Sequence, residues 1–265
     1  MFELNGDAQV IAFKDIKGRS AIIVDDFYRD PDEVRELALS LKYDDGVEKG
    51  GFPGIRGSFK TPEVKEKLYN LYLDLCTNKL WEFRYKPTQL LSDGSFKIPL
   101  LKKNRPFNVD EFDRNWNNQG FMVNVSNDTY LKKNPLGIIP HQDYWQDEEP
   151  TFQFGSVIYL NTPDECAGGT NLYSCNGEMS IPKRVQTWNA TMEFWMQELD
   201  GIETDIEKFK YIKSKVNENI PYNCEFEADM VYNRMVLYQS DVLHSADVDL
   251  GMFTNYNRLN QVFFL

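Results

Sequence analysis

The spacing of apolar residues near the start of the chain predicts a strand followed by an amphipathic helix. Residues 20–28 are largely apolar and lead into a turn, which is typical of a strand. Asp30 suits the N-cap of a helix, and Pro31 suits its first position, where a missing N–H is tolerated. Apolar residues then recur at helical spacing to about Tyr43, at Val34, Leu37, Ala38 and Leu41.

A second amphipathic helix is predicted after a glycine-rich loop. The loop covers residues 50–54, and the helix begins at Thr61-Pro62-Glu63 and ends near Lys79. Short strands are predicted at residues 81–85 and 94–101. The polar residues 102–118 favour no particular element.

From Phe121 onward the pattern changes to short strands separated by turns. A loop over residues 127–137 leads to residues 139–145, and Gly168-Gly169 is typical of a turn before a strand. The predicted strands lie at residues 121–125, 152–161, 170–173, 229–232, 234–238 and 259–265.

A polar, helix-favouring stretch over about residues 187–219 interrupts these strands. We expect it to be a helical insertion over the mouth of a barrel, with apolar positions at Phe194, Met196, Leu199, Ile202, Ile206, Phe209 and Ile212. Short strands at this spacing indicate a mainly β fold, a sandwich or barrel with flanking helices. We expect one domain over residues 1–265, in which residues 1–84 supply a strand and supporting helices and residues 85–265 form the β core.

The composition is that of a globular domain and argues against nucleic acid or membranes as partners. Of the 265 residues, 42% are hydrophobic and 14% aromatic, and the net charge is −12. Nucleic-acid backbones and anionic membranes attract basic surfaces instead. No apolar run approaches the roughly 18 residues of a membrane span, and the first residues show no secretory signal. We therefore expect a cytoplasmic protein, whose oligomeric state the sequence leaves open.

The four cysteines favour a reducing compartment. Cys76, Cys166, Cys175 and Cys224 form no CxxC pair and have no zinc-ligand spacing. Cys166 and Cys175 could pair across a hairpin, but reduced thiols are the favoured interpretation.

The chain contains two histidines, His141 and His244, and Asp143 follows the first by two residues. In a strand, residues i and i+2 point to the same face, so His141 and Asp143 could reach one point in space. Two histidines and one carboxylate form the ligand set of non-haem Fe(II) oxygenases. The alternative is two unrelated structural histidines, one that caps a turn and one that is satisfied by hydrogen bonds. His244 lies in a turn-like stretch after a strand.

Arg258 begins the last predicted strand, fourteen residues after His244. An arginine offers a permanently charged fork that binds carboxylates through two hydrogen bonds. On its own, such a residue more often forms a surface salt bridge. Arg56 and Arg234 are rival cations for an anionic ligand, and Arg234 is the better candidate for a structural charge.

The order and spacing of these residues resemble the Fe(II)/2-oxoglutarate-dependent oxygenases. Residues 121–265 are similar to their double-stranded β-helix, a jelly-roll or cupin-like core whose signature is HxD, a distant His and then an Arg. Gly168-Gly169-Thr170 resembles a turn of the prolyl-hydroxylase-like members. Two N-terminal segments, Val24-Asp25-Asp26-Phe27 and Phe52-Pro53-Gly54-Ile55-Arg56, resemble the leader of an uncharacterised bacterial and phage branch.

The resemblance implies an enzyme that uses Fe(II), 2-oxoglutarate and O₂. His141, Asp143 and His244 would bind the metal, and Arg258 would bind the distal carboxylate of 2-oxoglutarate. Further candidates for contacts to this cosubstrate are Asn260, Tyr130, Asn124 and Tyr159. Related halogenating enzymes replace the acidic ligand by a small residue, so Asp143 favours hydroxylation or a related oxidation over halogenation.

Two other classes remain open: a non-catalytic cupin-like barrel that binds a metal or small ligand, and a metal-dependent isomerase or dioxygenase that uses no oxo acid. Neither needs a buried cation such as Arg258. The substrate, a small molecule or a peptide, cannot be identified from the sequence. Tyr144, Trp145 and Trp188 are candidates for its pocket or for ordinary packing. The acidic residues 147–149 are expected to form a solvated loop.

Overall fold

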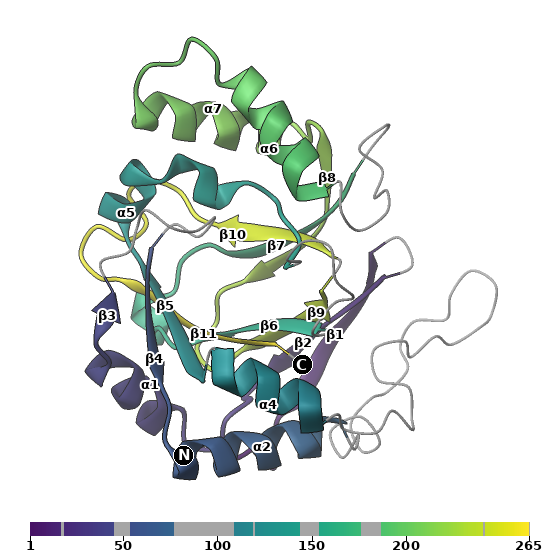
Figure 1. Cartoon of the computed structure of the whole chain (residues 1–265), viewed down its shortest axis with the longest axis vertical. Helices are drawn as coiled ribbons and strands as arrows, with labels where there is room; N and C mark the ends of the chain where they lie inside the picture. The colour runs from purple at the N-terminus through teal and green to yellow at the C-terminus, as the bar shows by residue number, and fades with distance from the viewer. Residues whose placement is uncertain are drawn as a thin grey trace, which may run out of the picture.

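The protein is mainly β, with two antiparallel sheets between helical layers (Figure 1). The structure is a computed structural model that describes residues 1–16, 19–44, 54–76, 109–118, 120–143, 154–175, 187–240 and 242–264. The coarse expectation of a mainly β fold with flanking helices is confirmed.

The larger sheet has eight strands, all paired antiparallel. In spatial order they are β1 (Gln9–Ile16), β2 (Arg19–Asp25), β9 (Met235–Gln239), β6 (Phe154–Tyr159), β11 (Arg258–Phe264), β5 (Phe121–Ser126), β4 (Ile55–Phe59) and β3 (Tyr43–Asp44). The central strand β11 lies between β6 and β5, so the last strand of the chain completes this sheet.

The smaller sheet consists of β10 (Leu243–Asp247), β7 (Gly169–Cys175) and β8 (Tyr222–Asp229), in that order. Its free edge at β10 is extended by an antiparallel bridge between His141 and His244. The Tyr159 hydroxyl of β6 donates to Thr170 Oγ1 of β7 at 2.7 Å, which joins the facing sides of the two sheets. At one side of the molecule β1 contacts both β7 and β8, and the Lys14 ammonium lies 4.5 Å from the ring centre of Phe226.

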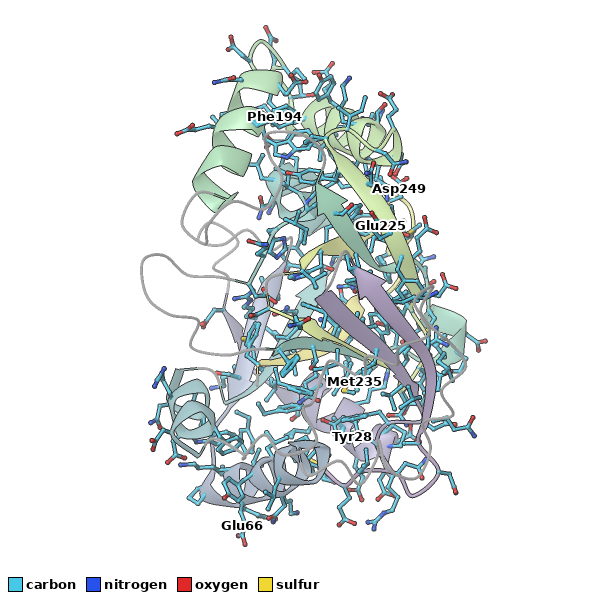
Figure 2. The ribbon with its side chains drawn as sticks, turned by 90° about the vertical axis from the view of Figure 1, so that its right-hand side faces the viewer. Tyr28, Glu66, Phe194, Glu225, Met235 and Asp249 are labelled. Atoms are coloured by element: carbon cyan, nitrogen blue, oxygen red, sulfur yellow. The ribbon has the colours of Figure 1, made fainter. Side chains whose placement is uncertain are left out.

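Three helices cover the outer face of the larger sheet: α1 (Pro31–Ser40), α2 (Pro62–Cys76) and α4 (Val109–Asn118) (Figure 1). They form one hydrophobic cluster with this face, made of Val34, Ala38, Val64, Leu68, Leu71, Phe112 and Trp116 from the helices and Val24, Val123, Ile158, Met235, Leu237 and Leu259 from the strands. In Figure 2, Tyr28 and Met235 mark this cluster, whereas Glu66 of α2 points outward.

A second helical layer, α6 (Thr187–Glu198) and α7 (Asp205–Asn217), lies over the smaller sheet (Figures 1 and 2). The predicted insertion at residues 187–219 is therefore helical and consists of two helices. Trp195 of α6 is completely buried, and its indole N–H lies 3.4 Å from the hydroxyl of Tyr222. The Lys213 ammonium of α7 pairs with Asp247 of β10 at 2.7 Å. These contacts fix the helices on the sheet that carries His244.

Several predicted elements differ from the structure because polar residues have local roles that a periodic pattern does not show. The predicted loop at residues 127–137 contains the helix α5 (Asp128–Lys133) and the 3₁₀ helix η1 (Pro135–Ile138). Asn127 caps α5, since its side chain accepts hydrogen bonds from the N–H groups of Thr129 and Tyr130.

The prediction of a strand at residues 229–232 is wrong. Asp229 ends β8, and the chain turns before β9 at Asn233, whose φ of 62° is tolerated by asparagine. His244 was expected in a turn but lies inside β10.

The first predicted helix begins at Pro31 as expected but ends three residues early, at Ser40, because Leu41 is extended and Tyr43 belongs to β3. The Asp30 side chain forms no hydrogen bond to the helix and pairs with Arg29 instead.

The second predicted helix corresponds to α2. The expected strands at residues 81–85 and 94–101, the loop residues 50–53, the end of α2 near Lys79 and residues 144–150 lie outside the described residues.

Cys166 and Cys224 are free thiols, so the Cys166–Cys175 pairing is not formed. Among the described residues, no helix combines the length and apolar character that crossing a membrane requires.

We expect that Trp195→Ala will lower the free energy of unfolding by about 3–5 kcal/mol, because it removes a completely buried indole beneath α6. The neighbouring Met196 is 60% exposed, and Met196→Ala should change stability by about 0.5 kcal/mol or less. Chemical denaturation of both variants measures the difference. Equal effects would contradict the packing of α6 on the smaller sheet.

Candidate metal centre

The structure brings His141, Asp143 and His244 together at the edge of the smaller sheet. The N–H of His141 donates to the carbonyl of His244 at 2.9 Å, and the N–H of His244 donates to the carbonyl of His141 at 2.8 Å. This reciprocal pair sets the two histidines side by side, with ring centres 4.6 Å apart. The N–H of Asp143 donates to the carbonyl of Ser240, directly after β9, at 3.3 Å.

The ligand atoms of these three side chains all lie within 4.8 Å of one another, so the group could hold a metal ion. Asp143 Oδ2 lies 3.4 Å from His244 Nε2. Within the described ranges no other group of three His, Cys, Asp or Glu side chains comes together in this way.

Both imidazoles are held in the tautomer that a metal requires. His141 Nδ1 lies 2.9 Å from the carbonyl oxygen of Ile139, and His244 Nδ1 lies 3.0 Å from that of Val242. A carbonyl oxygen only accepts hydrogen bonds, so each Nδ1 carries a proton, and in a neutral imidazole Nε2 is then the nitrogen that can bind a metal. Backbone carbonyls orient many metal-binding histidines in this way.

The electrostatic environment keeps His141 neutral. Burial and, to a smaller extent, the nearby His244 lower the pKa of His141 to about 4, although the Asp143 carboxylate acts in the opposite direction. A neutral imidazole is the form that binds a metal, so His141 needs no deprotonation at neutral pH.

Arg258 is a buried cation at the start of β11, with 3% of its surface exposed. It donates to Asn260 Oδ1 at 2.7 Å and to the carbonyl of Gly169 at 3.1 Å. Its Nε has no hydrogen-bond partner, and no described carboxylate forms a salt bridge with it. Burial lowers the pKa of Arg258, since desolvation disfavours the charged form.

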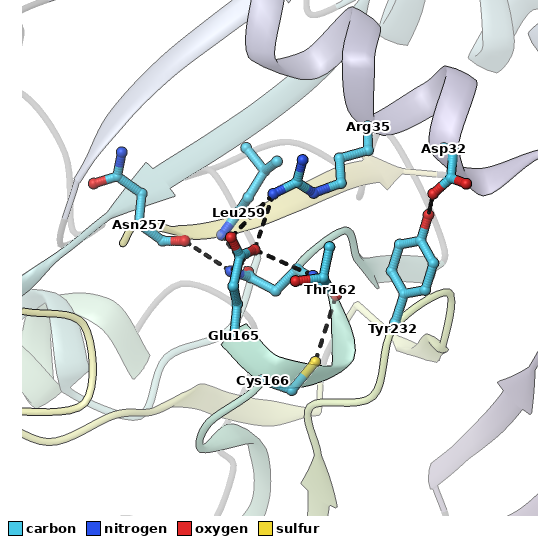
Figure 3. A network of polar contacts seen from close by, with 9 residues as sticks. Asp32, Arg35, Thr162, Glu165, Cys166, Tyr232, Asn257 and Leu259 are labelled. Atoms are coloured by element: carbon cyan, nitrogen blue, oxygen red, sulfur yellow. Dashed lines mark hydrogen bonds and ion pairs between the residues drawn. The ribbon is translucent and has the colours of Figure 1, made fainter. Parts of the chain in front are cut away.

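The backbone on both sides of Arg258 is fixed by one buried side chain. The amide of Asn161 accepts from the N–H of Leu259 at 2.7 Å and donates to the carbonyl of Asn257 at 2.8 Å. Glu165 lies next to this amide and pairs with Arg35 of α1, as Figure 3 shows. Arg258 therefore has little freedom to change its position.

A row of polar side chains crosses the larger sheet beside Arg258. Asn260 stands opposite Asn124 of β5 and Tyr159 of β6, and Arg56 of β4 stands opposite Asn124. Arg56 Nε donates to Asn124 Oδ1 at 3.1 Å. The Arg258 guanidinium lies 5.8 Å from the ring centre of Tyr159. The sequence-predicted residues Asn124, Tyr159, Asn260 and Arg258 thus share one face of the sheet.

The remaining candidates are placed differently. The Tyr130 side chain, in α5, makes no hydrogen bond to any residue in the described part of the chain. Arg234 forms a bidentate salt bridge with Asp25, at 2.6 and 3.0 Å, which confirms it as a structural charge. Tyr144, Trp145 and the acidic residues 147–149 lie outside the described residues, as does the side chain of Trp188.

Sequence reasoning missed two residues at the metal centre, Tyr238 and Gly155. The Tyr238 hydroxyl donates to Asp143 Oδ2 at 3.3 Å, and a Cβ at Gly155 would lie 2.7 Å from the same oxygen. A glycine inside an apolar strand is a signal of close approach by another group. Nothing in the sequence distinguishes Tyr238 from other core tyrosines.

A family model matches residues 125–257, which is half of the chain. The chain belongs to the DUF6445 family. This family is described as one of unknown function. Neither the curated proteins nor the solved structures include a match to the chain.

The segment shared with DUF6445 contains His141, Asp143 and His244, so the candidate metal centre lies within it. Asn124 and Arg258 lie one residue outside its two ends. The family match therefore covers the candidate ligands but says nothing about their chemistry.

If the three side chains bind a metal, His244→Ala or Asp143→Ala should weaken the binding of Co(II) more than about 100-fold. Loss of a direct ligand should exceed the roughly 10–100-fold loss typical of an outer-shell partner. Isothermal titration calorimetry at equal pH measures the dissociation constants. Asp164→Ala, which removes an exposed carboxylate, is the control and should bind Co(II) like the wild type. Wild-type affinity in Asp143→Ala would rule out this ligand set.

Proposed function

We propose that the protein is an Fe(II)- and 2-oxoglutarate-dependent oxygenase that hydroxylates a small-molecule or peptide substrate. The arrangement of His141, Asp143 and His244 supports a ferrous site, because two imidazoles and one carboxylate on one side of the ion leave the other positions open. Asp143 occupies the acidic ligand position, which supports hydroxylation over halogenation.

The main support for the proposal is Arg258, a buried cation that forms no salt bridge with a described carboxylate. A buried cation of this kind favours the binding of an anionic ligand. An unpaired buried charge is unfavourable by several kcal/mol. The guanidinium donates to Asn260 and to the carbonyl of Gly169 and interacts with the Tyr159 side chain, but its Nε has no hydrogen-bond partner in the described part of the chain. The distal carboxylate of 2-oxoglutarate would supply the missing charge and acceptors.

The distance between Arg258 and the metal centre suits a dicarboxylate. On the inner face of β6, Gly155 contacts Asp143 and Tyr159 contacts Arg258. These residues are four positions apart, roughly 13 Å along a strand. An extended arginine side chain and a five-carbon oxo acid bound to the metal together span such a distance.

The path of the chain supports a double-stranded β-helix. From β5 onward the chain alternates between the two sheets: β5 in the larger, the His141 segment beside the smaller, β6 in the larger, β7 and β8 in the smaller, β9 in the larger, β10 in the smaller and β11 in the larger. Jelly-roll and cupin-like barrels are built from two facing sheets of this kind.

When bound, Fe(II) would supply the oxidising chemistry in which 2-oxoglutarate, O₂ and a substrate C–H group give succinate, CO₂ and the hydroxylated product. The protein's own residues bind and orient the reactants. His141, His244 and the Asp143 carboxylate would hold the ion. Arg258 and Asn260 would hold the distal end of the cosubstrate, and the Tyr159 hydroxyl is oriented by its hydrogen bond to Thr170.

Two other activities would need the same three ligands but no buried cation. They are metal binding without turnover in a cupin-like barrel, and an oxygenase or isomerase reaction without an oxo acid. Unpaired Arg258 favours the 2-oxoglutarate reaction over both.

The purified protein with Fe(II), ascorbate and O₂ should convert 2-oxoglutarate to succinate slowly in the absence of substrate, as measured by mass spectrometry. His244→Ala should abolish this conversion. Metal binding without succinate formation and without 2-oxoglutarate binding would favour the cupin-like alternative.

Replacing Arg258 should affect the cosubstrate far more than the metal. Arg258→Met keeps the volume but removes the charge-assisted hydrogen bonds, so we expect the dissociation constant of 2-oxoglutarate to rise on the order of 10–100-fold. Co(II) affinity should stay near that of the wild type. Pyruvate, which lacks the distal carboxylate, should bind equally to both proteins. Exposed Arg29, replaced by alanine, serves as the control.

A loss of pyruvate and Co(II) binding equal to the loss of 2-oxoglutarate binding in Arg258→Met would contradict the assigned role. It would indicate that Arg258 only stabilises the fold.

A further inference from the structure

The end of β9 holds Asp143 at two points. The Tyr238 hydroxyl donates to Asp143 Oδ2 at 3.3 Å, and the carbonyl of Ser240 accepts from the Asp143 N–H at 3.3 Å. Tyr238 lies in β9, and Ser240 directly follows this strand. The side chain and the backbone of Asp143 are therefore fixed by one short segment.

The Tyr238 ring fits its place because its cross-strand neighbours are small. Tyr238 stands opposite Gly155 of β6 and Ala21 of β2. On its inner side the ring lies against His244, with ring centres 4.3 Å apart and an angle of 38° between the planes. Tyr238 thus contacts two of the three candidate metal ligands.

Gly155 provides the space for this contact. A Cβ at this position would lie 2.7 Å from Asp143 Oδ2 and 2.9 Å from Cε2 of the Tyr238 ring. Both distances are shorter than non-bonded atoms tolerate. Any side chain at residue 155 would have to displace the carboxylate or the ring.

The hydrogen bond from Tyr238 acts on the oxygen that faces the other ligands. Asp143 Oδ2 is also the atom that lies 3.4 Å from His244 Nε2. A free carboxylate rotates about its Cβ–Cγ bond and can bind a metal through one oxygen or both. With Oδ2 held by the phenol, one orientation is favoured.

We propose that Tyr238 is a positioning residue that fixes the Asp143 carboxylate for metal binding, in space that only a glycine at residue 155 leaves open. This inference rests on the proposed function, since it requires that Asp143 bind the metal. Tyr238 itself contacts neither metal nor cosubstrate in this role.

Tyr238→Phe tests the hydroxyl while it keeps the ring on His244. With Co(II) as the probe, we expect about a 10–100-fold increase in the dissociation constant, the range found for outer-shell partners of metal ligands. The visible absorption bands of bound Co(II) should also shift, because they report the geometry of the ligands. A loss of fold stability alone would not move them.

Tyr28→Phe is the matched control. Tyr28 is also a buried tyrosine whose hydroxyl donates a hydrogen bond, to Gln261 at 2.7 Å, but it belongs to the cluster on the opposite face of the larger sheet. We expect Tyr28→Phe to leave the Co(II) affinity and spectrum unchanged.

Two further variants separate positioning from general destabilisation. Gly155→Ala should weaken Co(II) binding and shift its spectrum, whereas Gly6→Ala, where a Cβ would have open space, should do neither. In an Asp143→Ala background, Tyr238→Phe should have no further effect on Co(II) affinity, because the group that it positions is gone.

Co(II) binding by the wild type separates the two proposals. If the wild type binds Co(II) and Tyr238→Phe matches it in affinity and spectrum, the role of Tyr238 is overturned and the proposed function stands. An additional loss of affinity in the Asp143→Ala background would also overturn it, since Tyr238 would then act by another route. If the wild type does not bind Co(II), the proposed function fails and this inference fails with it.

Discussion

The reciprocal backbone hydrogen bonds between His141 and His244 are the contact on which the rest of the site depends. They join the segment after η1 to the edge strand β10 and so bring together residues that are far apart in the sequence. The Nδ1 of each imidazole then lies against a backbone carbonyl, that of Ile139 for His141 and that of Val242 for His244. The main-chain pair thus determines the spacing of the two histidines, and the two carbonyls orient their rings.

The two faces of the larger sheet differ in character. The outer face of the larger sheet is covered by α1, α2 and α4 and supplies much of the hydrophobic core. Its inner face carries buried polar groups, among them Arg258, Asn260 and Asn124, which are unfavourable in a core unless they are hydrogen-bonded. The burial of these polar groups, together with the unsatisfied Nε of Arg258, supports the proposal that this face binds a polar ligand.

Much of the candidate site followed from the sequence because its residue types are rare or distinctive. The chain has only two histidines, so His141 and His244 stood out, and Asp143 followed from the i, i+2 rule although His141 forms only an isolated bridge. Asn260 was a candidate for the same ligand as Arg258, and the two side chains are hydrogen-bonded. Tyr238 could not be found in this way, because a tyrosine in an apolar strand has the pattern of ordinary core.

The sequence by itself determined the mainly β class, the starts of α1 and β11, the helical character of residues 187–219 and the identities of the candidate ligands, since these depend on local spacing and residue chemistry. Only the tertiary structure decided that His244 lies in a strand, that Gly155 leaves room for the Asp143 carboxylate, and that Arg258 is buried with no salt bridge to a carboxylate of the described residues. Each of these depends on pairing between distant segments, and local sequence patterns carry no record of which segments will meet.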